Sequence, residues 1–136
     1  MSAFFSSFVS LYFTAFFYLF AGLYHFINPD FYIKMMPSWF AEKYLLNALA
    51  GITEIILALA LLIPKLRNWG VYGIVTLLIS FFSVHINHFF EPPLLQLGNY
   101  QVDFSQTPIY YGLFLRLSLH FFLLWWIWQL RKQTNF

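Results

Sequence analysis

Three ionisable side chains lie inside stretches of sequence that are otherwise apolar. Glu54 falls in the middle of residues 44–63, and Arg116 and His120 fall within residues 109–130. A charged side chain at membrane depth costs free energy, so such residues usually mark a binding site, a proton path or a buried pair. Arg116 and His120 are four residues apart and therefore share one face of a helix.

The depths of these three residues nearly coincide. At 1.5 Å per residue, Glu54 lies about 15 Å from the start of its segment, Arg116 about 10 Å and His120 about 16 Å from the start of theirs. We therefore expect Glu54 to pair with Arg116, and His120 to be the better proton carrier. If the site is an enzyme's, these are its catalytic residues. An arginine held by a carboxylate can still offer spare donors to a carbonyl or an anion.

The composition places the chain in a membrane. Of its 136 residues, 61% are hydrophobic and 9% are charged, which does not describe a soluble globular domain. Four segments reach the length of about 20 apolar residues that crosses a bilayer: residues 4–27, 44–63, 69–90 and 109–130. We expect one transmembrane domain, residues 1–136, folded as an all-α four-helix bundle.

The basic residues predict the orientation of this bundle in the cell membrane. Lys65 and Arg67 lie between the second and third segments, and Arg131 and Lys132 follow the fourth. Because basic residues collect on the cytoplasmic side, both termini are expected there. The first segment is expected to be a retained helix, since no positive region precedes it. The net charge of +2 is small, and nucleic acid is not expected as a partner.

Further polar residues follow helical spacing toward the outer half of the bundle. Tyr18 and His25 share a face of the first segment, Asn47 lies seven residues before the carboxyl of the second, and His85 and His88 lie three apart in the third. Residues that serve only to join helices need not collect in one half of a bundle. The pattern predicts a polar cavity that opens outward, with these five as ligand-binding residues.

The histidines leave a metal or a haem as alternatives. His85 and His88, with His25, His120 and Glu54, are residue types that bind iron, zinc or copper. However, the Glu-x-x-His pattern of di-iron bundles is absent, and the chain has no cysteine for a thiol reaction or a covalent haem. We expect no metal site and rank haem or metal below a quinone or another flat, apolar ligand, which an aromatic-walled cavity would suit.

The two connections at the outer end are more specific than the helices. Residues 28–30, Asn-Pro-Asp, stop the first helix, and residues 31–42 mix aromatic and polar side chains around Pro37. This segment is expected to lie in the membrane interface or, alternatively, to form a lid. Residues 94–104 alternate around Gly98-Asn99, which predicts a short outer β-hairpin that caps the cavity. Pro92-Pro93 and Pro108 are expected to stop the adjoining helices.

Three stretches carry a resemblance to a known family. They are AGLYHFINPDFYIKMMPSWF, GITEIILALALLIP and LRLSLHFFLLWW, and the positions that carry the likeness are Gly22, His25, Pro29, Pro37, Gly51, Glu54, Arg116 and His120. Through them the chain resembles the DoxX family of small four-helix membrane proteins over residues 18–128.

The resemblance implies a function as well as a bundle. That family is named for a membrane subunit associated with quinone-linked oxidation of reduced sulfur compounds. For this chain it implies the membrane component of a quinone-linked redox system, in which Arg116 donates to a quinone oxygen, His120 or His25 handles the proton and Glu54 orients Arg116. No flavin, haem or iron-sulfur motif is visible in the sequence, so a redox partner protein would have to exchange the electrons.

A second interpretation comes from a different class of protein. The chain could be a noncatalytic binding, transport or scaffold protein in which Glu54 and Arg116 form a structural pair between helices. Four helices are few for a transporter, so transport would require a homo-oligomer. In both interpretations the lipid bilayer is the first partner.

Overall fold

The computed structural model describes residues 8–92, 94–97, 100–103 and 107–133. Four long helices make up most of it, and their order along the chain is α2 (Phe8–Ile27), α4 (Lys43–Leu62), α5 (Arg67–Phe90) and α6 (Thr107–Leu130). Short elements join them: α3 (Pro29–Ile33), the 3₁₀ turn η1 (Pro64–Leu66), the strands β1 (Leu94–Leu97) and β2 (Tyr100–Asp103), and a final 3₁₀ turn η2 (Arg131–Gln133).

Each of the four apolar segments predicted from the sequence is a helix, and their limits differ by one or two residues where both are described. The first four residues of the first predicted segment lie outside the described residues. Pro108 does not stop a helix as expected; it lies in the first turn of α6. A proline is tolerated there because the first turn of a helix has no partner for the amide hydrogens.

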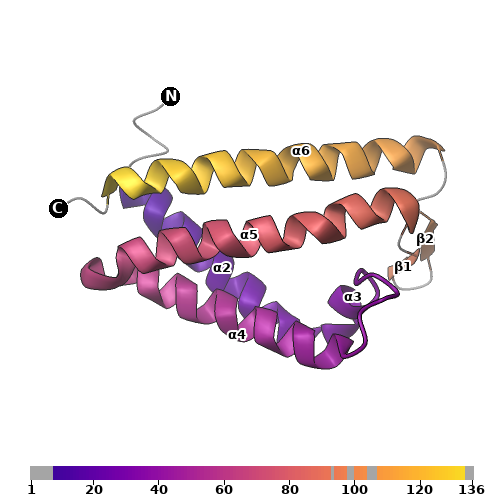
Figure 1. Ribbon diagram of the computed structural model, residues 1–136, viewed down its shortest axis with the longest axis horizontal. Coiled ribbons are helices and arrows are strands. Elements are labelled where there is room, and N and C mark those ends of the chain that lie inside the picture. The colour runs from indigo at the N-terminus through magenta and orange to yellow at the C-terminus, as the bar shows by residue number, and fades with distance from the viewer. Residues whose placement is uncertain (1–7, 93, 98–99, 104–106, 134–136) are drawn as a thin grey trace.

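The long helices lie side by side and alternate in direction, as Figure 1 shows. The start of α2, the end of α6 and the α4–α5 connection lie at one end, which we call the terminus end. The helix α3 and the strands lie at the opposite end, the strand end. Around the bundle, α2 packs on α4, α4 on α5 and α5 on α6, whereas α2 and α6 meet only sparsely. Hence α4 and α6 are diagonal, and a seam runs between α2 and α6.

The segment between α5 and α6 contains two short antiparallel strands. Leu94 pairs with Asp103 and Leu97 with Tyr100. Residues 98–99 therefore connect the two strands in the sequence. These two residues, the turn of the predicted hairpin, lie outside the described residues. The strands lie beyond the ends of the long helices at the strand end (Figure 1).

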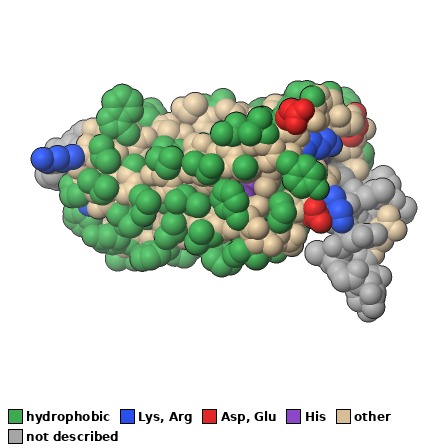
Figure 2. Space-filling model, turned by 90° about the horizontal axis from the view of Figure 1, so that it is seen from below, with side chains coloured by type: hydrophobic (Ala, Val, Ile, Leu, Met, Phe, Trp, Pro, Cys, Tyr) green, Lys and Arg blue, Asp and Glu red, His purple; other side chains and the backbone are tan. Residues whose placement is uncertain are grey.

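The surface of the bundle suits a lipid environment. All four long helices are long and apolar enough to cross a membrane, and large apolar side chains on them face outward, including Phe20, Tyr72, Ile79 and Leu115. On the face drawn in Figure 2, hydrophobic side chains cover the middle and charged ones gather at the two ends. A continuous apolar band of this size is rare on soluble proteins. The structure is therefore consistent with a multi-pass membrane protein.

A close contact between two glycines sets the distance between α2 and α4. A Cβ atom at Gly22 would lie 2.8 Å from the carbonyl oxygen of Gly51, and one at Gly51 would lie 2.9 Å from the carbonyl oxygen of Gly22. Since a larger side chain would meet backbone at either position, only glycine allows this approach. Small residues at helix interfaces are the usual way in which membrane helices come close.

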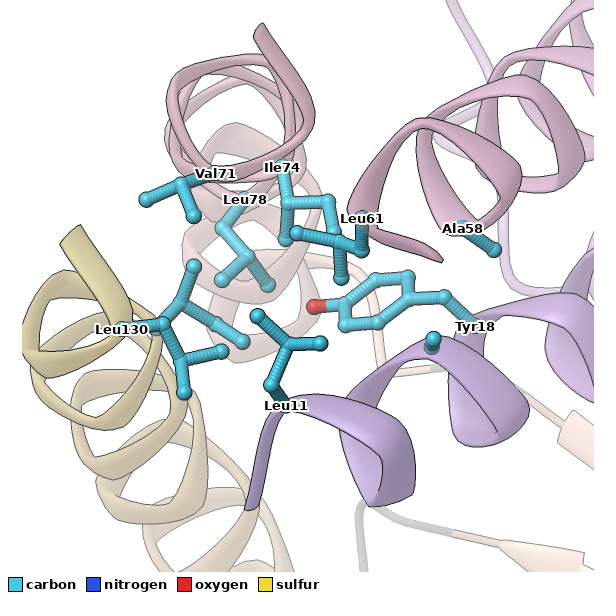
Figure 3. Close-up of a cluster of buried hydrophobic side chains, with 10 residues drawn as sticks. Leu11, Tyr18, Ala58, Leu61, Val71, Ile74, Leu78 and Leu130 are labelled. Carbon is cyan, nitrogen blue, oxygen red and sulfur yellow. The ribbon is translucent and has the colours of Figure 1, made fainter. Parts of the chain in front are cut away.

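The apolar core occupies the terminus end. Leu11 and Ala15 of α2, Ala58 and Leu61 of α4, Val71, Ile74 and Leu78 of α5 and Ile127 and Leu130 of α6 are buried together there. Figure 3 shows the ring of Tyr18 reaching from α2 into this cluster. Toward the strand end the buried side chains become polar: His25, Asn47, Glu54, His88 and His120. Although Ser10 and Thr14 are also buried near the start of α2, most buried ionisable side chains lie toward the strand end, so we call the two ends the apolar half and the polar half of the bundle.

We expect the replacement of Gly51 by alanine to destabilise the protein by about 1–3 kcal/mol, because the added methyl group would overpack the α2–α4 contact. A Cβ at Gly51 would lie 2.7 Å from the Cβ of His25 and 2.9 Å from a backbone oxygen. Gly73→Ala is the matched control, since a Cβ there meets only the flexible side chain of Leu57. Thermal unfolding in detergent measures both. Equal stability of the two variants would contradict the close contact.

Candidate functional site

A cavity of about 260 Å³ lies in the polar half of the bundle. All four long helices, α3 and the segment after it contribute to its walls. The lining residues are Phe17, Tyr18, Ala21, His25, Tyr32, Met35, Met36, Ala50, Glu54, Leu78, Phe81, Val84, His85, Arg116, His120 and Leu123. Its size is near the lower end of the range for small-molecule sites, and its mix of aromatic walls and few polar groups is typical of them.

One wall carries the imidazole of His25 from α2 and the carboxyl of Glu54 from α4, and the amide of Asn47 supports them from behind. The Nδ1 atom of His25 lies 2.7 Å from Oδ1 of Asn47, and Nδ2 of Asn47 donates to the carbonyl oxygen of His25 at 2.9 Å. Because the amide oxygen can only accept, Nδ1 of His25 carries the proton. This leaves Nε2 directed at Glu54, whose Oε2 lies 3.7 Å away. Asn47 thus fixes the ring rather than lining the cavity.

The Oε2 atom of Glu54 has no hydrogen bond in the described structure, although it is buried. The 3.7 Å separation from Nε2 of His25 is too long for a hydrogen bond. A buried carboxylate oxygen without a donor is costly, so such an atom usually needs an explanation. Because Glu54 lines the cavity, a ligand held there could supply the missing donor.

Tyr32 of α3 covers this wall on the side of the strand end. Its ring stacks on that of His25 with centroids 3.5 Å apart and planes 13° from parallel. Its hydroxyl donates to the carbonyl oxygen of Ala21 at 3.4 Å. Burial, with the nearby charge of Glu54, raises the pKa of Tyr32 to about 12, so the hydroxyl keeps its proton. Tyr32 therefore fixes α3 over the imidazole of His25.

The opposite wall carries a guanidinium held by a histidine. Nη1 of Arg116 donates to Nδ1 of His88 at 3.0 Å, and Nε2 of His88 donates to the carbonyl oxygen of Met35 at 2.7 Å. Since one ring nitrogen accepts and the other donates, His88 is the neutral tautomer with both nitrogens used. The other nitrogens of Arg116 make no hydrogen bond within the described residues, and Arg116 lines the cavity. It therefore has donors to spare for a ligand.

Two more histidines complete this wall. Nε2 of His120 donates to the carbonyl oxygen of Leu78 at 2.8 Å, which leaves Nδ1 as a free acceptor in the neutral ring. The ring of His85 lies 4.5 Å from that of His120. Its nitrogens have no hydrogen-bond partner within the described part of the chain, and both rings line the cavity. His85 and His120 are therefore the groups on this wall that could accept or release a proton.

The segment between α3 and α4, residues 34–42, forms a strap across the strand end of the cavity. Met35 and Met36 line the cavity, and the carbonyl oxygen of Met36 accepts a hydrogen bond from Nζ of Lys43. The hydroxyl and amide of Ser38 donate to the carboxylate of Glu91. These bonds lower the pKa of Glu91, because they favour its charged form. The strap thus contributes Met35 and Met36 to the cavity wall, and hydrogen bonds to His88 of α5 and to Glu91 just after α5 hold it in place.

The expected pairing of Glu54 with Arg116 is wrong. Within the described chain Glu54 faces Nε2 of His25 at 3.7 Å, and Arg116 bonds to His88. The two residues face the same cavity from helices that are diagonal in the bundle. Glu54 meets the histidine of the neighbouring α2, which the Gly22–Gly51 contact brings close. Arg116 meets the histidine of its own neighbour, α5.

The structure therefore brings together most of the residues singled out from the sequence. Tyr18, His25, Glu54, His85, Arg116 and His120 line one cavity, while Asn47 and His88 support it from behind. Sequence reasoning missed Tyr32, Met35 and Met36, because they lie outside the apolar segments and carry no helical spacing. No group of three metal-ligating side chains is found within the described residues.

We expect double-mutant cycles to separate the two walls. Glu54→Gln and His25→Ala should couple by about 0.5–3 kcal/mol in unfolding experiments, because each removes half of one contact. Arg116→Met and His88→Ala should couple in the same way. Glu54→Gln with Arg116→Met is the control cycle and should be additive within about 0.5 kcal/mol. Strong coupling between Glu54→Gln and Arg116→Met, without coupling in the other two cycles, would show that Glu54 and Arg116 interact directly.

Comparison with known proteins places the chain in a family. Searches among curated proteins and among solved structures gave no match. The model of the family described as "Domain of unknown function (DUF8561)" matches residues 14–131, which include all four long helices nearly in full and every residue of the cavity. The chain is a member of the DUF8561 family.

Proposed function

We propose that the cavity binds the head group of a quinone or quinol, and that the protein is the membrane component of a quinone-linked redox system. One observation carries the proposal: a buried carboxylate oxygen without a donor and a guanidinium with unused donors face the same aromatic-walled cavity. A quinol has a hydroxyl at one end that can donate to Glu54. It has an oxygen at the other end that can accept from Arg116.

The roles of the residues follow from their hydrogen bonds. Arg116 binds one ligand oxygen, and His88, rather than Glu54, orients it. Glu54 accepts the hydroxyl proton of a quinol, and Nε2 of a neutral His25 beside it takes the proton onward. His120 and His85 serve the other oxygen in the same way. Oxidation of a quinol releases two protons and two electrons, so the two walls take the protons and a redox partner protein takes the electrons.

We also propose that the strand end faces outward and that both termini are cytoplasmic. The support is the positive-inside rule, because Lys65, Arg67, Arg131 and Lys132 all lie at or next to the terminus end. In this orientation the cavity lies in the outer half, beneath the strap. The two strands act as an outer hairpin that caps it. We also propose that the chain is related to the DoxX family, on the positions that carry the resemblance, among them His25, Glu54, Arg116 and His120.

A second candidate function is a noncatalytic binding, transport or scaffold protein. The observation that favours it is the use of polar residues as ties between helices: Asn47 and His25 join α4 to α2, and His88 and His120 join α5 to α6. Such interhelical bonds stabilise membrane bundles without any chemistry. Transport by this protein would require a homo-oligomer. This candidate predicts a stable protein with no quinone bound.

We expect the protein purified in mild detergent to contain quinone, detectable by liquid chromatography and mass spectrometry of an organic extract. Glu54→Gln and Arg116→Met should each weaken binding of a short-chain benzoquinone by about 10- to 100-fold, since each removes a charge-assisted hydrogen bond of about 1.5–3 kcal/mol. Lys65→Met, an exposed substitution at the terminus end, is the matched control and should bind as the unmodified protein does.

Circular dichroism and size-exclusion chromatography check that the variants remain folded. Glu54→Gln keeps the shape of the side chain, so it tests the charge without opening a hole. Two results together would contradict the proposal: an organic extract that contains phospholipid but no quinone, and equal affinity of all variants for the benzoquinone. That outcome would favour the noncatalytic alternative.

A further inference from the structure

A second hollow lies in the seam between α2 and α6, and it is apolar. It measures about 310 Å³. Phe13 and Thr14 of α2 and Leu119, Phe122 and Trp126 of α6 are among its lining residues. Because Phe13 and Leu119 are more than half exposed and Phe122 is also exposed, this groove opens toward the lipid. We call it the seam groove.

The polar atoms of the seam groove are turned away from it. The hydroxyl of Thr14 donates to the carbonyl oxygen of Ser10 at 2.9 Å, and Nε1 of Trp126 donates to the hydroxyl of the same serine. The stacked rings of Phe13 and Trp126, 5.6 Å apart and 8° from parallel, form a bridge between α2 and α6 toward the terminus end. The groove thus offers shape and hydrocarbon contact, not hydrogen bonds.

The seam groove adjoins the polar cavity. Phe17, Tyr18 and Leu123 line both. The two spaces therefore share a wall formed by two adjacent residues of α2 and one residue of α6. Together they make a site with a polar head space beneath the strap and an apolar extension that runs toward the terminus end. From Leu119 to Trp126 the extension follows α6 for about 10 Å.

We propose that the seam groove holds the hydrocarbon tail of the ligand whose head group occupies the cavity, and that this ligand enters sideways from the bilayer through the seam. The inference rests on the proposed function and adds to it the class of ligand, a quinone with a long alkyl or isoprenoid chain. Three features support it: the groove shares lining residues with the cavity, its outer side chains are exposed, and it lies between α2 and α6, the neighbouring long helices with the fewest contacts.

The groove directs the tail more than it adds affinity. A tail in the bilayer is already surrounded by hydrocarbon, so its transfer to an apolar groove gains little hydrophobic free energy. What the groove supplies is a fixed direction, which places the attached head between Arg116 and Glu54. The test must therefore measure where the tail lies.

The experiment uses a benzoquinone with an alkyl tail that ends in a photoreactive diazirine. The full-length protein is placed in phosphatidylcholine nanodiscs, illuminated with this probe and digested for mass spectrometry. We expect labels concentrated on residues 13–17 of α2 and 119–126 of α6. An excess of the same quinone without the diazirine should remove these labels.

Two variants on one face of α6 provide the control. Leu119→Trp fills the seam groove and should reduce labelling there at least fivefold, while binding of a tailless benzoquinone stays unchanged. Leu115→Trp places the same bulk one turn away, outside the lining of the groove, and should label as the unmodified protein does. Competable labels on α4 or α5, or equal labelling of the two variants, would contradict the placement of the tail in the seam groove. The proposed site for the quinone head would still stand. The absence of any competable label would overturn the proposed quinone site as well.

Discussion

The close approach of α2 to α4 at Gly22 and Gly51 is the contact on which the rest of the site depends. It brings His25 within reach of Asn47 and Glu54, and the exchange of two hydrogen bonds between His25 and Asn47 then fixes the ring against the carboxylate. Without that approach the carboxyl of Glu54 would lie at membrane depth with no imidazole beside it, which is costly. On the opposite side α5 and α6 are joined in a similar manner, by the bonds of His88 and His120. The cavity lies between these two helix pairs, because each pair bonds some of its polar groups to one another and leaves others, Oε2 of Glu54 and the remaining donors of Arg116, facing the cavity.

The division of the bundle into an apolar and a polar half gives the cavity its position. Leucine, isoleucine and valine side chains hold the four helices together at the terminus end. Since lipid chains are as apolar as these side chains, packing and interhelical hydrogen bonds, rather than water exclusion, stabilise such a bundle. The strap and Tyr32 close the strand end, and the seam between α2 and α6 is left as the weakest boundary. A ligand that is polar at one end and apolar at the other matches this arrangement.

The sequence was sufficient to predict the four helices and the depth of the buried polar residues, but not their partners. Helix limits follow from the length of each apolar run, and depth follows from the rise per residue. Depth does not say which helices are neighbours, so it could not show that α4 and α6 are diagonal. This is why the sequence predicts Arg116 as the partner of Glu54, whereas the structure places His25 beside it. Gly22 and Gly51 carried a usable signal, since small residues at matching depth mark a close helix contact. The strap could not be placed, because nothing in its composition distinguishes a lid from a segment lying in the membrane interface.

The most direct test of the account is infrared difference spectroscopy of the reduction of a quinone bound to the protein, in the unmodified form and in Glu54→Gln. If the head lies between Arg116 and Glu54, the two carbonyl stretches should differ from each other and from those of the free quinone. A carboxyl band should also change on reduction and vanish in Glu54→Gln. Carbonyl bands identical to those of the quinone in detergent, with no carboxyl band that depends on Glu54, would contradict the account.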